Sequence, residues 1–266
     1  MSAIIDDSGD GVVNSSGGGA TAEGHTLLFY NRLEPLEPGR HGALSLVAAN
    51  KTFDFARQTN SVPLNAIEFI AAARHYPILF NGDERGMPLA LVGLRAHENL
   101  FVEDGGHWAE GCYIPAFIRR YPFVLTNPRN AEDIALCVDP DAPLIESGGD
   151  RPLFSEGVPT PVLQNVAKFC ASYAREQNRT RDLVAALRDA GVLIDRSVDI
   201  ALRDGEKVAM RGFKVVDEKK FQALPDDVVL AWWHNGWLGA IHAHMVSLGN
   251  FGRLHVRADG AEAEEA

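Results

Sequence analysis

Cysteines, basic residues and long apolar runs are all scarce in this sequence. Only three cysteines occur among 266 residues, at positions 112, 137 and 170, and none forms a CxxC pair. This pattern argues against a disulfide framework and favours free thiols in a reducing compartment. No stretch approaches the ~20 apolar residues of a membrane span. The first ten residues hold no basic side chain and no apolar run, so we expect no Sec signal and a cytoplasmic location, while export to the cell surface by a non-Sec route stays open.

Lysine and arginine together number 25 against 36 acidic residues, for a formal charge of −11. Such a balance argues against a nucleic-acid partner, which needs a clustered basic surface. Residues 1–24 and 258–266 each carry four acidic residues and no basic one. Removing these eight charges from −11 leaves −3 on the body, residues 25–257. Both polar ends are predicted to be disordered tails because they offer little apolar area to bury.

Familiar cofactor and catalytic motifs are also missing. The sequence contains no GxGxxG, Walker, GxSxG, HExxH or kinase signature, so we predict no cofactor. His234, His242 and His244 are the densest candidate metal ligands. On a helix, residues 242 and 244 would point about 200° apart, and residues 234 and 242 would lie about 12 Å apart along the axis. We therefore expect no metal site.

The hydrophobic periodicity predicts an α+β fold, with a β-rich first half of short strands and hairpins. We expect the first helix to begin at Pro63 and to continue to His75, and a turn or two of helix over 114–120. Strands are expected at 27–30, 43–48, 77–80, 89–94, 99–102, 107–108, 123–125 and 133–138. The polar loop 81–86 would join one hairpin, and 103–106 a second.

The second half is predicted to be helix–hairpin–helix. Residues 139–160 are rich in proline and glycine, which indicates a linker or long loop and a possible boundary inside the body. Apolar spacing then predicts a helix over 162–173, a second helix capped by Thr180 that stops at Gly191, and a short helix after Asp217. A hairpin is expected between 194–202 and 207–216, around Asp204 and Gly205. The last long helix is expected over 226–248.

The most unusual segment is 113–123, where two adjacent arginines lie among aromatic residues and prolines in an acidic protein. Guanidinium groups flanked by rings suit carboxylate or peptide recognition. The candidate binding residues are Trp108, Tyr113, Arg119, Arg120 and Tyr121. Neighbouring residues diverge in direction, so we expect one guanidinium to be buried against an internal carboxylate. The other would face a groove edged by the aromatic candidates.

Two alternatives stay open at this point. The arginines could pair with the protein's own carboxylates while the rings fill the core. An unrecognised enzyme site could also use His107, Trp108 and Arg119, because the loop 103–108 holds an acid, an imidazole and an indole. A hairpin turn with an anchoring tryptophan explains that loop equally simply.

A family resemblance is carried by the runs 76–80, 88–94, 98–101 with Trp108 and, most specifically, 113–123, and more weakly by residues within 60–69 and by 213–218 with Gly236, Leu238 and Ser247. Together they resemble the SapC family of bacterial proteins, over roughly 27–255. The resemblance implies association with a bacterial surface layer, for which the family is named. It also implies an accessory role in peptide or protein modification or in TonB-dependent uptake, since many members are encoded beside TonB-dependent receptors and halogenase-like proteins. It supplies no catalytic residues.

We accordingly expect a soluble, non-catalytic binding or adaptor protein with a protein or peptide partner. A structural surface-layer component and an enzyme with an unrecognised site are the alternatives.

Overall fold

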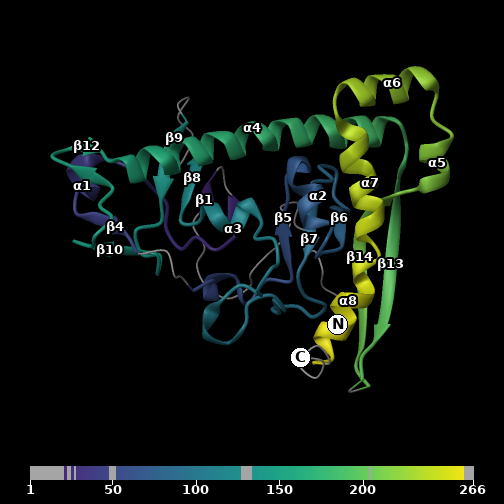
Figure 1. The fold of residues 1–266 in the computed structure, drawn as a ribbon, viewed down its shortest axis with the longest axis horizontal. Helices are drawn as coiled ribbons and strands as arrows, with labels where there is room; N and C mark the ends of the chain where they lie inside the picture. The colour runs from purple at the N-terminus through teal and green to yellow at the C-terminus, as the bar shows by residue number, and fades with distance from the viewer. Residues whose placement is uncertain are drawn as a thin grey trace.

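The computed structural model describes residues 21–22, 25–26, 28–47, 52–126, 134–203 and 205–260. Within them, a five-stranded and a three-stranded antiparallel sheet lie at different positions along the long axis of the molecule (Figure 1). The helix α4 (Pro161–Asp189) runs along the same axis past both sheets (Figure 1). At 1.5 Å per residue its 29 residues extend over about 43 Å. The α+β class predicted from the sequence is confirmed.

The five-stranded sheet has the order β13-β14-β6-β7-β5. Its centre is the hairpin of β6 (Ile78–Asn81) and β7 (Pro88–Leu91), in which Ile78 lies opposite Ala90. Every residue of these two strands is buried, so both faces of this hairpin are covered. The predicted hairpin around the polar loop 81–86 is therefore confirmed. The edge strand β5 (Ser61–Pro63) pairs with β7.

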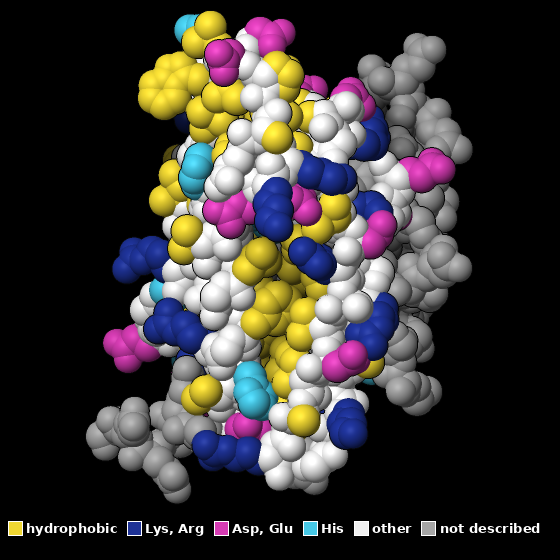
Figure 2. All heavy atoms as spheres, turned by 90° about the vertical axis from the view of Figure 1, so that its right-hand side faces the viewer, with side chains coloured by type: hydrophobic (Ala, Val, Ile, Leu, Met, Phe, Trp, Pro, Cys, Tyr) yellow, Lys and Arg dark blue, Asp and Glu magenta, His cyan; other side chains and the backbone are white. Residues whose placement is uncertain are grey.

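The other edge of this sheet is the long hairpin of β13 (Leu193–Ala201) and β14 (Lys207–Val216), as the sequence predicted. The strand β13 is the outermost, and its register shifts between Arg196 and Val198. Figure 2 looks at the face of the molecule that includes this hairpin and the C-terminal helices. Hydrophobic side chains run down the middle of that face between charged ones.

The three-stranded sheet joins β3 (Glu34–Pro35), β9 (Ala135–Val138) and β8 (Phe123–Thr126). Short strand pairs surround it. They are β4 (Leu44–Leu46) with β10 (Ile145–Ser147), and β11 (Phe154–Ser155) with β12 (Val158–Pro159). A further pair joins β1 (Thr21–Ala22) to β2 (His25–Thr26). The helix α1 (Pro38–His41) precedes β4.

Residues 139–160 form more than a connecting loop. They contribute β10, β11 and β12, and Leu153 and Phe154 are buried with Leu163 of α4 in one hydrophobic cluster. The prolines and glycines shape tight turns here instead of an open linker. The N-terminal tail lies outside the described residues apart from Thr21–Ala22 in β1, and so does 261–266.

The helix predicted to begin at Pro63 begins later, and Pro63 instead ends β5. It consists of the 3-10 turn η2 (Ala66–Glu68) and α2 (Phe69–Ala72). Asn65 and Glu68 form a capping box, with the Asn65 backbone N–H donating to Glu68 Oε2 at 2.9 Å. A proline at a helix start is a weaker signal than a side chain that satisfies the exposed amides, and here the capping box sets the boundary.

The helix α4 is continuous where two helices were predicted. Thr180 lies in its interior, where its hydroxyl donates to the Glu176 carbonyl at 2.7 Å and accepts from the Ala66 backbone N–H at 2.9 Å. The residue therefore caps η2, a neighbouring element, instead of its own helix. Gly191, at φ 66°, follows the helix end as predicted.

Three helices replace the single C-terminal helix that was predicted. They are α6 (Asp226–His234), α7 (Trp237–Ser247) and α8 (Asn250–Ala258). Gly236 adopts φ 73°, which breaks the helix after α6 at little steric cost. The short α5 (Glu218–Gln222) is capped by Asp217, as expected. Asp259 lies just past α8 and accepts from the Arg203 backbone N–H at 3.0 Å.

Two smaller predictions in the first half are wrong. The residues 28–29 form a turn and not a strand. The second hairpin shrinks to a single bridge between Val102 and Trp108, with the 3-10 turn η3 (Asp104–Gly106) between them. A further 3-10 turn, η1 (Asp54–Ala56), lies much earlier in the chain. The strand 133–138 starts at Ala135, and the helix predicted over 114–120 is α3 (Ala116–Arg120).

The candidate metal ligands are separated by the helix break, since His234 is in α6 while His242 and His244 are in α7. His244 is fully buried against the sheet. The Val216 backbone N–H donates to its Nε2 at 3.0 Å, and its Nδ1 lies 2.9 Å from the Ile78 carbonyl. Among the described residues, no group of three or more His, Cys, Asp or Glu side chains is placed to hold a metal ion.

Burial lowers the pKa of His244 to about 4, so the ring is neutral in the folded protein. An unfolded histidine titrates near 6.5, and the unfolded chain therefore binds more protons between these pH values. We expect His244 to stabilise the fold fully above pH ~6.5 and to lose about 3 kcal/mol of that stability as the pH falls through ~4. Urea unfolding of the wild type and of His244→Gln across pH 4–7 measures this. Parallel pH profiles for the two proteins would contradict the assignment.

Gly82 and Gly212 let the β13–β14 hairpin pack closely on the central hairpin. The Gly82 backbone N–H donates to the Gly212 carbonyl at 3.0 Å, and a Cβ on Gly82 would lie 2.5 Å from that oxygen. We expect Gly82→Ala to lower the free energy of unfolding by about 1–3 kcal/mol, because the backbone has to separate. Gly39→Ala is the matched control, since its Cβ would meet no atom within 4 Å. Equal denaturation midpoints for the two variants would refute the close-contact explanation.

Candidate functional site

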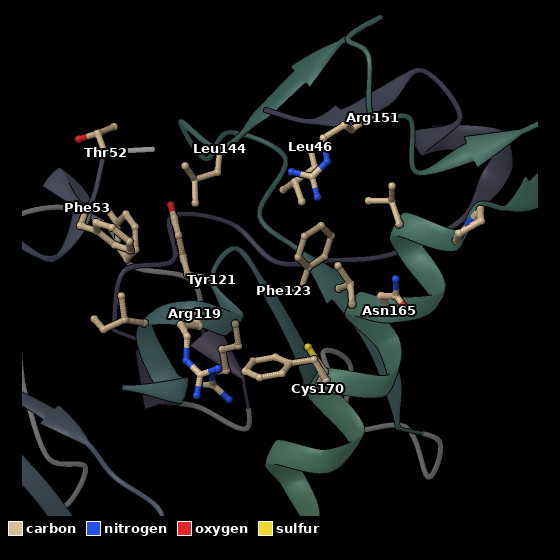
Figure 3. A pocket seen from close by; sticks show the side chains of 17 residues that line it. Leu46, Thr52, Phe53, Arg119, Tyr121, Phe123, Leu144, Arg151, Asn165 and Cys170 are labelled. Atoms are coloured by element: carbon tan, nitrogen blue, oxygen red, sulfur yellow. The ribbon is translucent and has the colours of Figure 1, made fainter. Parts of the chain in front are cut away.

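A cavity of about 480 Å³ lies where α3, α4, β8 and the loops before η1 and β10 meet (Figure 3). Its wall is mainly apolar. The aromatic rings that line it are those of Phe53, Phe55, Tyr121, Phe123 and Phe169. This volume falls in the ~300–1,000 Å³ range of small-ligand pockets. The cavity is therefore the right size for a small molecule or for one or two residues of a peptide.

The helix α4 supplies one wall because apolar residues recur along one of its faces. Val162, Val166 and Phe169 follow each other at four- and three-residue steps, Cys170 lies four residues after Val166, and all four line the cavity. Burial raises the pKa of the Cys170 thiol to about 11, so the group is protonated near neutral pH. It adds apolar surface to the wall and is a poor nucleophile in that state.

The helix α3 supplies the opposite wall and ends at Arg120 because of the following residues. Tyr121 precedes Pro122, and a residue before proline avoids the helical conformation. Tyr121 accordingly has φ −60° and ψ 137°. This extended geometry brings its ring to the cavity, where it stacks on Phe55 with a centroid distance of 4.2 Å.

Glu68 holds the start of α3. Its Oε1 accepts from the Ala116 backbone N–H at 2.7 Å and from the Tyr113 hydroxyl at 2.9 Å, while its Oε2 accepts from the Asn65 N–H. Burial raises the pKa of this carboxyl, and the hydrogen bonds oppose the shift. The buried carboxylate therefore links η2 to α3.

Arg119 is exposed but held in place. Its Nε donates to the Ile114 carbonyl at 3.0 Å and its Nη2 donates to the Tyr113 hydroxyl at 3.2 Å. The guanidinium also lies 5.2 Å from the centre of the Phe169 ring. A relay thus runs from Glu68 through Tyr113 to Arg119, and it orients this arginine at the cavity.

Arg120 is half-buried between two rings. Its guanidinium carbon lies 4.3 Å from the centre of Phe117 and 4.5 Å from that of Tyr173. Within the part of the chain that the structure describes, its buried Nε has no hydrogen-bond partner and no carboxylate pairs with it. The expectation that the more buried arginine would pair with an internal carboxylate is therefore wrong. Cation–π stacking holds the group in its place.

Arg151 is the third cationic residue of the cavity. It follows β10, and its Nη1 lies 3.5 Å from the Val47 carbonyl, a long hydrogen bond. Figure 3 shows Arg151 and Arg119 on opposite sides of the cavity, with Phe123 between them. Sequence reasoning missed this residue because the segment 139–160 reads as a loop. The local sequence offers one arginine two positions before the apolar pair Leu153 and Phe154, which by itself does not indicate a binding site.

The charge of the cavity contrasts with that of the protein. Arg119, Arg120 and Arg151 line it, and no aspartate or glutamate is among the described lining residues. The other polar groups in that set are the side chains of Thr52 and Asn165, the Tyr121 hydroxyl and the Cys170 thiol. A net positive, largely apolar cavity in a chain of charge −11 favours an anionic ligand with an apolar body.

The structure brings together part of the predicted set of binding residues. Arg119, Arg120 and Tyr121 line the cavity, and Tyr113 holds Arg119 from outside the lining. Trp108 is buried behind this wall, where its Nε1 donates to the Tyr76 hydroxyl at 3.0 Å and its ring meets that of Phe53 edge-on. His107, exposed in its loop, is not among the described lining residues.

The residues that sequence reasoning missed are the aromatic pair Phe53 and Phe55, the α4 face and Arg151. Phe53 and Phe55 are more than 60 positions before α3 in the chain, so no local pattern relates them to it. The two phenylalanines alternate around Asp54, but this spacing alone does not relate their rings to a cavity.

The described part of the chain is thus an α+β protein with one arginine-lined apolar cavity between α3 and α4. The chain belongs to the SapC family, whose family model matches residues 36–254. Comparisons with curated proteins and with solved structures found no match. Among the helices of the described residues, none combines the length and apolarity needed to cross a membrane.

The Glu68 relay predicts a measurable stability effect. Replacing Glu68 by Gln converts one acceptor oxygen into an NH₂ group that faces other donors, so at least one buried hydrogen bond is lost. We expect Glu68→Gln to lower the free energy of unfolding by about 1–3 kcal/mol. Glu110→Gln, at an exposed position of the same chain, should change it by less than about 0.5 kcal/mol. Chemical denaturation measures both, and equal effects would show that the relay is not stabilising.

Proposed function

We propose that this SapC-family protein is a non-catalytic binding or adaptor protein that captures a carboxylate-bearing peptide or protein partner at the arginine-lined cavity. The observation that carries the proposal is the Arg120 guanidinium, which has a buried Nε without a partner among the described residues. A buried donor without an acceptor is costly, and a ligand carboxylate would supply the missing acceptor.

The other residues that line the cavity support the same proposal. Arg119 and Arg151 add positive charge, and the stacked rings offer apolar area to the ligand body. The groups that would be expected of a hydrolytic or nucleophilic centre are not assembled in the described lining, where the thiol of Cys170 has a raised pKa. Binding is therefore the simplest use of these residues.

Membership of the SapC family bears on the cellular role and location of the protein. Capture of a peptide or protein end fits the accessory role in modification or TonB-dependent uptake that the family resemblance implies. We place the protein in the cytoplasm, which Cys137 and Cys170 support as buried free thiols. Cell fractionation with an antibody against the protein distinguishes this location from the cell surface.

Peptide capture tests the proposed function. Immobilised protein is incubated with a chymotryptic digest of bacterial proteins, and retained peptides are identified by mass spectrometry. We expect retention by the wild type, loss of at least about tenfold with Arg120→Met, and no retention from a digest whose carboxylates have all been converted to amides. Arg175→Met removes the same charge from an exposed site on α4 and should retain the wild-type set.

Folding of the variant is checked separately. Arg120→Met should melt within a few degrees of the wild type, because no described carboxylate is left unpaired by the change. Equal retention by the wild type and Arg120→Met, or equal retention from the amidated digest, would contradict the proposed function.

A further inference from the structure

The geometry around Arg120 restricts what its guanidinium can bind. Phe117 and Tyr173 lie 4.3 and 4.5 Å from the guanidinium carbon and occupy its neighbourhood as stacking partners. The N–H groups all lie in the guanidinium plane, so an incoming acceptor has to approach along the edge. A planar acceptor with two oxygens matches two parallel N–H groups of that edge.

The rest of the cavity restricts the body of the ligand. Five aromatic rings and the aliphatic side chains of α4 line it, with few polar groups among the described residues. A volume of about 480 Å³ accommodates a large apolar side chain but not an extended peptide.

Arg119 adds a second, pre-oriented donor. Its Nε and Nη2 are engaged by Ile114 and Tyr113, which fixes the plane of its guanidinium while Nη1 makes no hydrogen bond within the described residues. A donor that is already ordered loses little side-chain entropy when the ligand arrives. Both arginines come from the last turn of α3, so they present a single cationic end to the apolar cavity.

We propose that the cavity binds a terminal carboxylate attached to a large apolar body, an inference that rests on the proposed function. The carboxylate lies along the edge of Arg120 beside Arg119, and the apolar body lies against Phe123, Phe169 and Val166. Two sources share this chemistry: the chain end of a peptide whose last residue is aromatic or large aliphatic, and a free apolar carboxylic acid.

Calorimetric titrations with defined probes test this ligand class. Four synthetic peptides share one glycine–serine leader and end in phenylalanine acid, phenylalanine amide, glycine acid, or glutamate followed by phenylalanine amide. The phenylalanine acid should bind at least about tenfold more tightly than each of the other three. Arg120→Lys should weaken it by about tenfold or more, because an ammonium keeps the charge but lacks the planar fork. Arg175→Met should bind like the wild type.

The outcomes separate this inference from the proposed function. Equal binding of the glutamate peptide and the phenylalanine acid, still dependent on Arg120, would overturn the terminal-carboxylate inference while the proposed function stands. Equal binding of the glycine acid would overturn the apolar part. No binding of any probe, together with failed capture from the digest, would overturn both.

Small-molecule probes assign the source of the ligand. If 3-phenylpropionate binds as tightly as the phenylalanine acid peptide, the carboxylate chemistry is supported and the ligand is a free acid. Much tighter binding of the peptide supports a chain end. Tighter binding of phenyl phosphate than of 3-phenylpropionate would overturn the inference, because the site would then prefer a phosphate to a carboxylate.

Discussion

The buried carboxylate of Glu68 is the interaction on which the arrangement of the cavity depends. Three donors from two segments converge on its two oxygens: the Asn65 and Ala116 backbone N–H groups and the Tyr113 hydroxyl. A carboxylate is costly to remove from water, and these donors offset that cost only if η2 and the start of α3 are both in place. The position of α3, and with it the direction of Arg119, therefore follows from one side chain some 50 residues earlier.

The helix α4 has a comparable role at longer range. Leu163 and Cys170, near its start, pack into the hydrophobic cluster of the three-stranded sheet, while Leu183 and Leu187 pack into that of the five-stranded sheet. The cavity lies against its first three turns. One wall of the cavity is thus continuous with an element that is anchored in both cores.

The sequence predicted the parts of the fold that local chemistry decides. The polar loop 81–86 and the Asp204–Gly205 pair indicated hairpins that the structure has, and Asp217 caps α5 as expected. The errors arise where distant segments supply the deciding contact. Thr180 serves the amide of Ala66, 114 positions away, and so it does not begin a helix of its own.

The same distinction applies to the site. Arg119, Arg120 and Tyr121 could be selected because aromatic residues and guanidinium groups adjoin in one short segment. Arg151, Phe53 and Phe55 reach the cavity only through the pairing of β4 with β10 and the packing of η1, which no local pattern encodes. The partner predicted for Arg120 was also wrong, because the rings of Phe117 and Tyr173 hold the guanidinium, whereas a carboxylate was expected.

The outer edge of the five-stranded sheet determines how another chain can approach this protein. The edge strand β13 carries Asp195, Arg196 and Asp199, and its register shifts in the middle. Charged side chains and an irregular register disfavour the addition of a further strand, so this edge is protected against growth by self-association. Another chain is therefore directed away from backbone pairing on β13 and toward recognition through side chains.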